Sequence, residues 1–108
     1  MIHELAPAEL AQWRDDPART ALLLLDVREP WEFQVCRIEG SVSVPLVQLQ
    51  ARLTDLPRDR PVVAVCHHGH RSYRAASWLQ RVGIADVWNL RGGVAAWAAE
   101  VDPRMPTY

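Results

Sequence analysis

Residues 62–72 read Val62-Val63-Ala64-Val65-Cys66-His67-His68-Gly69-His70-Arg71-Ser72, and this stretch decides the fold. Its four apolar residues follow a proline and precede a glycine-containing loop, which predicts a buried strand over 62–66. Beyond the loop, apolar side chains recur at helical spacing and predict a helix over 72–82. Strand, loop and helix in this order place Cys66 at the carboxyl end of the strand, beside the first turn of the helix.

The rest of the chain repeats this alternation of apolar strands and amphipathic helices. Strands are predicted at 2–5, 21–27, 42–44 and 87–90, and helices at 7–15, after Pro30, after Pro45 and over 94–101. Strands joined by helices of this length run parallel, and near-continuous apolar strands indicate that both faces of the sheet are covered. We therefore predict an α/β protein with a three-layer α/β/α fold and a five-stranded parallel sheet. Ligands of such sheets bind beyond the carboxyl ends of the strands, where Cys66 and residues 26–28 both fall.

Composition limits the class of protein. With 108 residues and 49% hydrophobic content, the chain is expected to form a single domain over 1–108, with the proline-containing residues 102–108 as an extended tail on the surface. A net charge of −1 offers no footprint for nucleic acid or an anionic membrane. The longest apolar run, Ala21 to Leu25, cannot span a bilayer, and no basic stretch with a long apolar run opens the chain. Two cysteines are too few for a disulfide framework, so we expect a cytoplasmic protein.

The loop that follows Cys66 has the composition of an anion site. A helix N-terminus and neighbouring cations favour a cysteine thiolate over the thiol, and the thiolate is the nucleophile. Gly69 is expected to adopt a backbone conformation that turns the amides of residues 67–72 inward. Arg71 would attract an anionic donor or pair with an acidic residue and brace the loop, and Ser72 is placed to cap the helix. The loop histidines would add partial positive charge below neutral pH; they are His67, His68 and His70.

Three segments in this order match one known pattern. The first is Cys66-His67-His68-Gly69-His70-Arg71-Ser72, and the second is Leu24-Leu25-Asp26-Val27-Arg28-Glu29-Pro30-Trp31-Glu32-Phe33, followed by residues 37–46. The third is Asn89-Leu90-Arg91-Gly92-Gly93 with Trp97. Together they resemble the rhodanese family, sulfurtransferases whose active-site cysteine carries a persulfide. The resemblance spans residues 21–98.

This resemblance implies a specific reaction. The Cys66 thiolate would attack the sulfane sulfur of a small anionic donor such as thiosulfate, release sulfite and hold the sulfur as a persulfide. A thiol, cyanide or a sulfur-acceptor protein would then remove it, and no metal or cofactor is expected. Asp26 and Arg28 are expected to support the site as an ion pair rather than to contact the substrate. The chain departs from the family pattern at Cys36 and Arg37, where Gly-His is usual, and Cys36 is interpreted as a half-buried hydrophobe or a resolving thiol.

Several alternatives compete with this interpretation. Phosphatases and arsenate reductases on the same fold place five residues between cysteine and arginine, whereas only four stand between Cys66 and Arg71. The cysteine and histidines of the loop match no structural zinc spacing. A noncatalytic interaction module remains an alternative, although inactive members commonly lack the cysteine. A sulfur-relay role also remains open, because residues 97–108 resemble the end of rhodanese domains fused to adenylating enzymes that load sulfur-carrier proteins.

Overall fold

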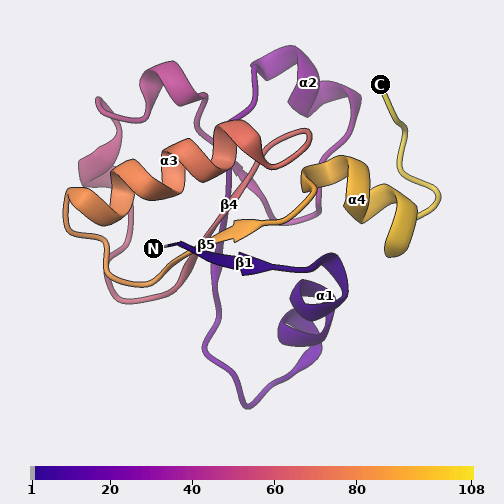
Figure 1. Cartoon of the computed structure of the whole chain (residues 1–108), viewed down its shortest axis with the longest axis horizontal. Helices are drawn as coiled ribbons and strands as arrows, with labels where there is room; N and C mark the ends of the chain where they lie inside the picture. The colour runs from indigo at the N-terminus through magenta and orange to yellow at the C-terminus, as the bar shows by residue number, and fades with distance from the viewer. Residues whose placement is uncertain (1) are drawn as a thin grey trace.

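The computed structural model describes residues 2–108 and contains a five-stranded sheet between helices (Figure 1). The strands are β1 (His3–Leu5), β2 (Leu23–Asp26), β3 (Val42–Ser43), β4 (Val62–Val65) and β5 (Val87–Leu90). They lie in the order β1-β5-β4-β2-β3, and every neighbouring pair is parallel. The predicted α/β class and five-stranded parallel sheet are therefore confirmed.

Three α-helices and two short 3₁₀ helices connect the strands, and a fourth α-helix follows β5. They are α1 (Pro7–Asp15), α2 (Pro30–Val35), α3 (His70–Arg81), α4 (Gly93–Glu100), η1 (Leu46–Gln48) and η2 (Leu53–Asp55). Proline opens α1 and α2, where its missing N–H costs no helical hydrogen bond. After Pro45 the side chains of Leu46, Leu49 and Leu53 pack against one core as the predicted stripe requires, but the continuous helix expected there was wrong. Arg52, with φ −100° and ψ 5°, interrupts the helical backbone there and leaves η1 and η2 as separate turns.

The two faces of the sheet carry separate apolar cores. Along β4, the side chains of Val62, Ala64 and Cys66 join the core beneath α3 and the 3₁₀ helices. Val63 and Val65 join the opposite core, which contains residues of α1 and α4. This period of two is what the pleat of a strand dictates, and it makes β4 fully buried on both faces. Figure 1 shows the same arrangement, with α3 on one side of the sheet and α1 and α4 on the other.

Helix α3 begins two residues earlier than the sequence predicted. Gly69 has a left-handed backbone (φ +98°) and ends the loop, so the first helical residue is His70. Ser72 is consequently the third residue of the helix, and its predicted role as the N-cap was wrong. This positive φ confirms the expectation that Gly69 provides an unusual backbone conformation. A β-carbon there would also stand only 3.1 Å from the Gly92 nitrogen.

Strand register brings the carboxyl ends of three strands together. Asp26 at the end of β2 pairs with Val65 at the end of β4, and Asn89 of β5 pairs with Ala64. The N–H of Val27 continues the ladder to the Val65 carbonyl at 2.9 Å. Cys66, Asp26 and the turn after β5 therefore share one edge of the sheet, where parallel α/β folds bind ligands.

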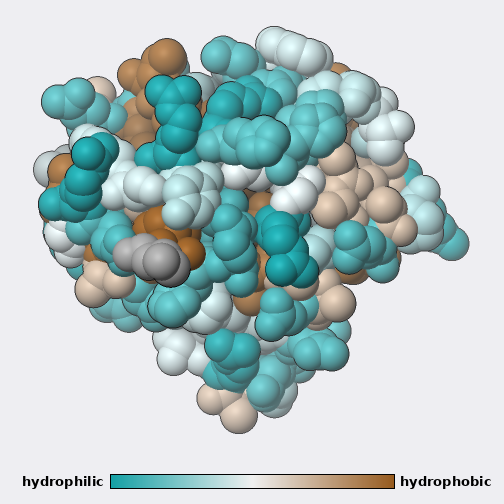
Figure 2. Space-filling model, viewed as in Figure 1, coloured by the Kyte–Doolittle hydropathy of each residue, from teal (hydrophilic) through white to brown (hydrophobic). Residues whose placement is uncertain are grey.

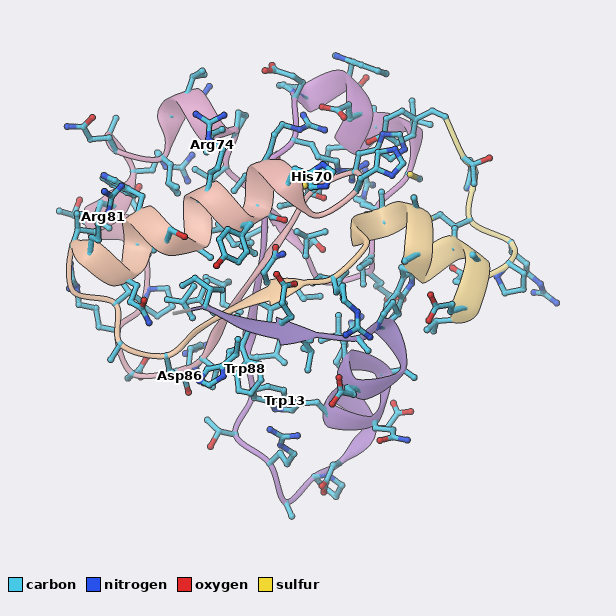
Figure 3. The ribbon with its side chains drawn as sticks, viewed as in Figure 1. Trp13, His70, Arg74, Arg81, Asp86 and Trp88 are labelled. Atoms are coloured by element: carbon cyan, nitrogen blue, oxygen red, sulfur yellow. The ribbon has the colours of Figure 1, made fainter. Side chains whose placement is uncertain are left out.

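The face viewed in Figure 2 is mostly polar, with hydrophobic atoms near the segment of the 3₁₀ helices and beside the N-terminal end of β1. Trp13 and Trp88 meet edge to face at 5.4 Å, and the Trp88 indole donates to Asp86 at 2.7 Å (Figure 3). Within residues 2–108, no helix is long and apolar enough to cross a membrane.

The tail after α4 is less extended than its prolines suggested. Residues 103 and 104 form a turn, in which the Met105 N–H donates to the Asp102 carbonyl at 3.1 Å. The Met105 side chain is buried in the core that contains residues of α1 and α4. This anchor redirects the last three residues towards α2 and the loop after β4 (Figure 1).

Candidate active site around Cys66

The sulfur of Cys66 is buried at the start of α3. The residue is only 1% exposed, and its Sγ accepts hydrogen bonds from the Gly69 N–H at 3.1 Å and the Ser72 N–H at 3.3 Å. The Ser72 hydroxyl lies 3.2 Å from the same sulfur. First-turn amides have no acceptor inside their own helix and form the positive end of its dipole. The site thus offers oriented donors to negative charge on sulfur.

Two more amides of this turn have no acceptor. The backbone N–H groups of His70 and Arg71 donate to no atom of residues 2–108. Figure 3 places His70 at the start of α3, next to the loop, with Arg74 and Arg81 farther along the helix. The cysteine loop, residues 66–72, therefore keeps hydrogen-bonding capacity for an additional anionic atom.

The start of α4 holds the cysteine loop from outside. The N–H of Val94 donates to the Cys66 carbonyl at 2.9 Å, and the N–H of Ala95 donates to the His67 carbonyl at 3.0 Å. These bonds require a close approach, because a β-carbon on Gly93 (φ +60°) would stand 2.3 Å from the Cys66 carbonyl oxygen. Gly93 thus allows the first turn of α4 to approach the backbone of the loop.

Asn89 connects the loop to the sheet and was not predicted as a site residue. Its side chain is buried, and its Nδ2 donates to the Gly69 carbonyl at 3.1 Å and to Glu4 Oε1 at 3.0 Å. Its Oδ1 accepts a hydrogen bond from the Ser72 hydroxyl. The amide therefore positions both Gly69 and Ser72, the two residues whose N–H groups reach Sγ. A lone polar residue inside the apolar strand 87–90 was the signal that could have identified it.

Arg71 forms a bidentate ion pair with Glu32 of α2. The two guanidinium nitrogens each lie 2.8 Å from a carboxylate oxygen, and the Glu29 N–H donates to the same carboxylate at 2.8 Å. Arg71 lowers the pKa of Glu32 from its ordinary 4.5 to about 2, against the opposing effect of burial. Two roles were predicted for Arg71, attraction of an anionic donor and pairing with an acidic residue. The ion pair with Glu32 corresponds to the second. Its partner, Glu32, was not predicted as a site residue.

Asp26 and Arg28 form a buried ion pair beneath the loop. Arg28 Nη2 lies 2.7 Å from Asp26 Oδ2, and neither side chain is more than 1% exposed. Burial works against the charge of Arg28, but hydrogen bonds to Asp26 and Tyr108 outweigh it and raise the pKa of the guanidinium. Arg28 also donates to the Cys36 carbonyl at 2.7 Å. The pair therefore fixes the turn between β2 and α2 and is not exposed to substrate.

Cys36 lies beside the Arg28 guanidinium. Its sulfur is 3.7 Å from Arg28 Nη1, and the residue is 6% exposed, so it is more buried than the sequence suggested. Both Cys36 and Cys66 are free of disulfides.

The loop histidines form part of an aromatic stack. The ring of His67 lies 4.0 Å from that of His68 and 4.0 Å from that of Tyr108, with an angle of 13° to the latter. Burial, followed by the charge of His68, lowers the pKa of His67 below 6.5. His67 therefore gains its positive charge at a lower pH than the sequence suggested. No cluster of three or more cysteine, histidine or acidic side chains suited to a metal ion occurs within residues 2–108.

A groove of about 710 Å³ lies between η1 and α3, apart from this site, and none of residues 66–72 lines it.

Several known proteins are similar to this chain in sequence. A sulfurtransferase from Allochromatium vinosum is 37% identical over 98 residues, which are 91% of this chain and 90% of that protein. The probable adenylyltransferase/sulfurtransferase MoeZ from Mycobacterium tuberculosis is 36% identical over 106 residues, which are 96% of this chain but only 26% of MoeZ. The chain thus spans about a quarter of that relative.

Solved structures share the fold. A rhodanese-related protein from Thermoplasma volcanium superposes with a TM-score of 0.82 and 29% identity, covering 92% of this chain and 93% of that one. The family model described as a rhodanese-like domain matches residues 6–100. The chain therefore belongs to the rhodanese-like domain family.

Proposed function

We propose that this protein is a sulfurtransferase that carries sulfane sulfur as a persulfide on Cys66. The observation that supports this most directly is the environment of Sγ. Two backbone amides donate to it at 3.1 and 3.3 Å at the start of a twelve-residue helix, and the Ser72 hydroxyl, which donates to Asn89, lies 3.2 Å away. Such donors stabilise an anionic sulfur without a metal or a nearby base. Relatives named sulfurtransferase, such as the one from Allochromatium vinosum, support the same reaction class.

The proposed reaction has two steps. First, the Cys66 thiolate attacks the sulfane sulfur of thiosulfate; a new S–S bond forms, the donor S–S bond breaks, and sulfite leaves with the bonding electron pair. Second, a nucleophilic acceptor attacks the terminal sulfur of the persulfide, and the Cys66 thiolate leaves. With cyanide as acceptor the product is thiocyanate. The protein returns to its starting state with no net oxidation.

The unused amides of the cysteine loop suit the persulfide intermediate. Its negative charge resides on the terminal sulfur, one atom beyond Sγ. The N–H groups of His70 and Arg71 have no acceptor within residues 2–108, and they belong to the same turn as the Ser72 amide. We propose that they bind this terminal atom. The loop has four residues between Cys66 and Arg71, one fewer than in the related phosphatases, which favours a single sulfur over a tetrahedral oxyanion.

A turnover assay tests this proposal. Purified protein is supplied with thiosulfate and cyanide, and thiocyanate is measured for wild type, Cys66→Ala and Cys36→Ala. We expect turnover in wild type and Cys36→Ala and none in a folded Cys66→Ala variant. Thiocyanate formation by folded Cys66→Ala would refute the persulfide mechanism.

A second candidate function is sulfur delivery to an acceptor protein. The match to MoeZ covers 96% of this chain, including part of the tail, and MoeZ is named as both an adenylyltransferase and a sulfurtransferase. We propose such a relay as the physiological alternative to a small-molecule acceptor. Persulfidated protein labelled with ³⁵S would be mixed with a sulfur-carrier protein bearing an adenylated C-terminus. Label transfer that requires Cys66 supports the relay, and label confined to small thiols contradicts it.

A further inference from the structure

The tail returns to the cysteine loop and places an aromatic ring there. Tyr108 stacks on His67 with 4.0 Å between ring centroids and an angle of 13°. Its other neighbour is Trp31 of α2, which it meets edge to face at 5.6 Å. Neither the sequence pattern nor the proposed reaction assigns Tyr108 a role. Its ring nevertheless covers part of the loop that surrounds the buried sulfur.

The Tyr108 hydroxyl joins the two ion pairs of the site. It accepts a hydrogen bond from Arg28 Nη1 at 2.9 Å and donates one to Glu32 Oε1 at 2.9 Å. That same Glu32 oxygen accepts from Arg71 Nη2 at 2.8 Å. Burial raises the pKa of Tyr108 to about 12, so the phenol keeps its proton at neutral pH and remains a donor. The Tyr108 hydroxyl is thus linked to the Arg71 guanidinium through two hydrogen bonds to the same Glu32 oxygen.

The main chain around Tyr108 is held weakly. Met105 anchors the tail in the core, but the backbone of residues 106–108 makes no hydrogen bond within the described part of the chain. Residues 106–108 are also exposed, and Tyr108 retains 37% of its accessible surface. The ring can therefore swing away by losing one stack, one edge contact, a cation–π contact with Arg28 and two hydrogen bonds, with little rearrangement of the core.

We propose that Tyr108 is a specificity-determining and positioning residue of the sulfur-transfer site. Its ring forms a movable wall beside Cys66 that admits small donors and acceptors and slows bulky ones. Its hydroxyl helps to hold Glu32 in the position that fixes Arg71. This inference deepens the proposed function and rests on Cys66 being the reactive thiol.

The rate at which thiol reagents alkylate Cys66 reports how far Tyr108 restricts access to the sulfur, and it does not require sulfur transfer. In a Cys36→Ala background, second-order rates of Cys66 alkylation would be determined with iodoacetamide and with the much larger fluorescein-5-maleimide. The variants are Tyr108→Phe, which keeps the ring, and Tyr108→Ala, which removes it. Tyr73→Ala is the matched control, because Tyr73 is 38% exposed and lines the groove away from the loop.

The variants should change the alkylation rates of the two reagents to different extents. Tyr108→Ala is expected to accelerate the bulky maleimide about tenfold more than iodoacetamide, whereas Tyr108→Phe and Tyr73→Ala should leave the ratio of the two rates within about twofold of its original value. Thermal unfolding would verify that each variant is folded. An unchanged rate ratio in folded Tyr108→Ala, or an equal change in Tyr73→Ala, would refute the proposal that the Tyr108 ring restricts access to Cys66.

Steady-state kinetics test the hydroxyl separately. Tyr108→Phe should raise KM for thiosulfate a few-fold with kcat nearly unchanged, because a less firmly held Arg71 weakens attraction of the anionic donor. A lower kcat with unchanged KM would contradict the positioning role. If the alkylation ratio changes as expected but neither wild type nor any variant turns over thiosulfate, the proposed function is refuted, whereas the proposal that the Tyr108 ring restricts access to Cys66 is supported.

Discussion

Replacing Glu32 by glutamine should destabilise the protein in a pH-dependent way. The carboxylate accepts two hydrogen bonds from Arg71, one from Tyr108 and one from the Glu29 N–H, all at 2.8–2.9 Å. Its pKa lies at about 2 instead of 4.5. A difference of roughly 2.5 pKa units corresponds to about 3 kcal/mol in favour of the ionised form in the folded protein. Glutamine removes the charge and turns an NH₂ group towards donors, so we expect a loss of about 3 kcal/mol at pH 7.

The sign of the pH dependence follows from the lowered pKa. The folded state holds Glu32 ionised, so its stabilisation is fully present above pH 4.5 and is lost as the pH falls towards 2. Urea unfolding of wild type and Glu32→Gln between pH 7 and pH 2.5 measures this. The difference in the free energy of unfolding should be largest at pH 7 and shrink steadily below pH 4.5.

A control separates this effect from general acid unfolding. Glu100→Gln, at the exposed end of α4, removes a carboxylate that makes no ion pair within residues 2–108 and should follow wild type at every pH. A Glu32→Gln variant within about half a kcal/mol of wild type at pH 7 would refute the reasoning, since that is the ordinary scatter of surface substitutions. A loss of stability that stays constant down to pH 2.5 would refute it as well.

Three further substitutions test other parts of the site. Gly93→Ala places a β-carbon 2.3 Å from the Cys66 carbonyl oxygen, so we expect a loss of more than about 3 kcal/mol in urea unfolding; a loss below about 1 kcal/mol would contradict this. Ser72→Ala removes the hydroxyl that donates to Asn89 and lies 3.2 Å from Sγ; losing the support of one hydrogen bond costs roughly 1 kcal/mol, so sulfur uptake should slow about fivefold in stopped-flow mixing with thiosulfate; an unchanged rate would show that this hydroxyl does not support the reactive sulfur. Arg71→Lys keeps the charge but not the bidentate pair, and should raise KM for thiosulfate more than for a neutral persulfide donor; equal effects would assign Arg71 to structure.

The features that the sequence predicted well are the local ones. Strand 62–65 and the helix after it follow from apolar spacing, and the left-handed Gly69 follows from the need to turn a short loop. These patterns are set by neighbours a few residues apart, which a sequence displays directly. The start of α3 was misplaced by two residues because the backbone of Gly69, rather than the Ser72 side chain, ends the loop.

The features that the sequence did not predict depend on distant pairs. Glu32 meets Arg71 across 39 residues, Asn89 meets Glu4 across 85, and Tyr108 meets Arg28 across 80. Each is a polar side chain whose importance comes from its partner in space, and no periodicity reveals that partner. Glu32 lies inside the 24–33 segment that resembles the family pattern, and Asn89 is a polar residue inside an apolar strand, so the sequence carries a signal for each of them.

The most direct test of the persulfide account is the intact mass of the protein before and after incubation with thiosulfate, followed by a chase with cyanide. We expect wild type and Cys36→Ala to gain one sulfur atom and to lose it in the chase, and folded Cys66→Ala to gain none. Sulfur uptake that persists in Cys66→Ala, or folded wild type that takes up no sulfur from thiosulfate or from a persulfide donor, would contradict the central claim.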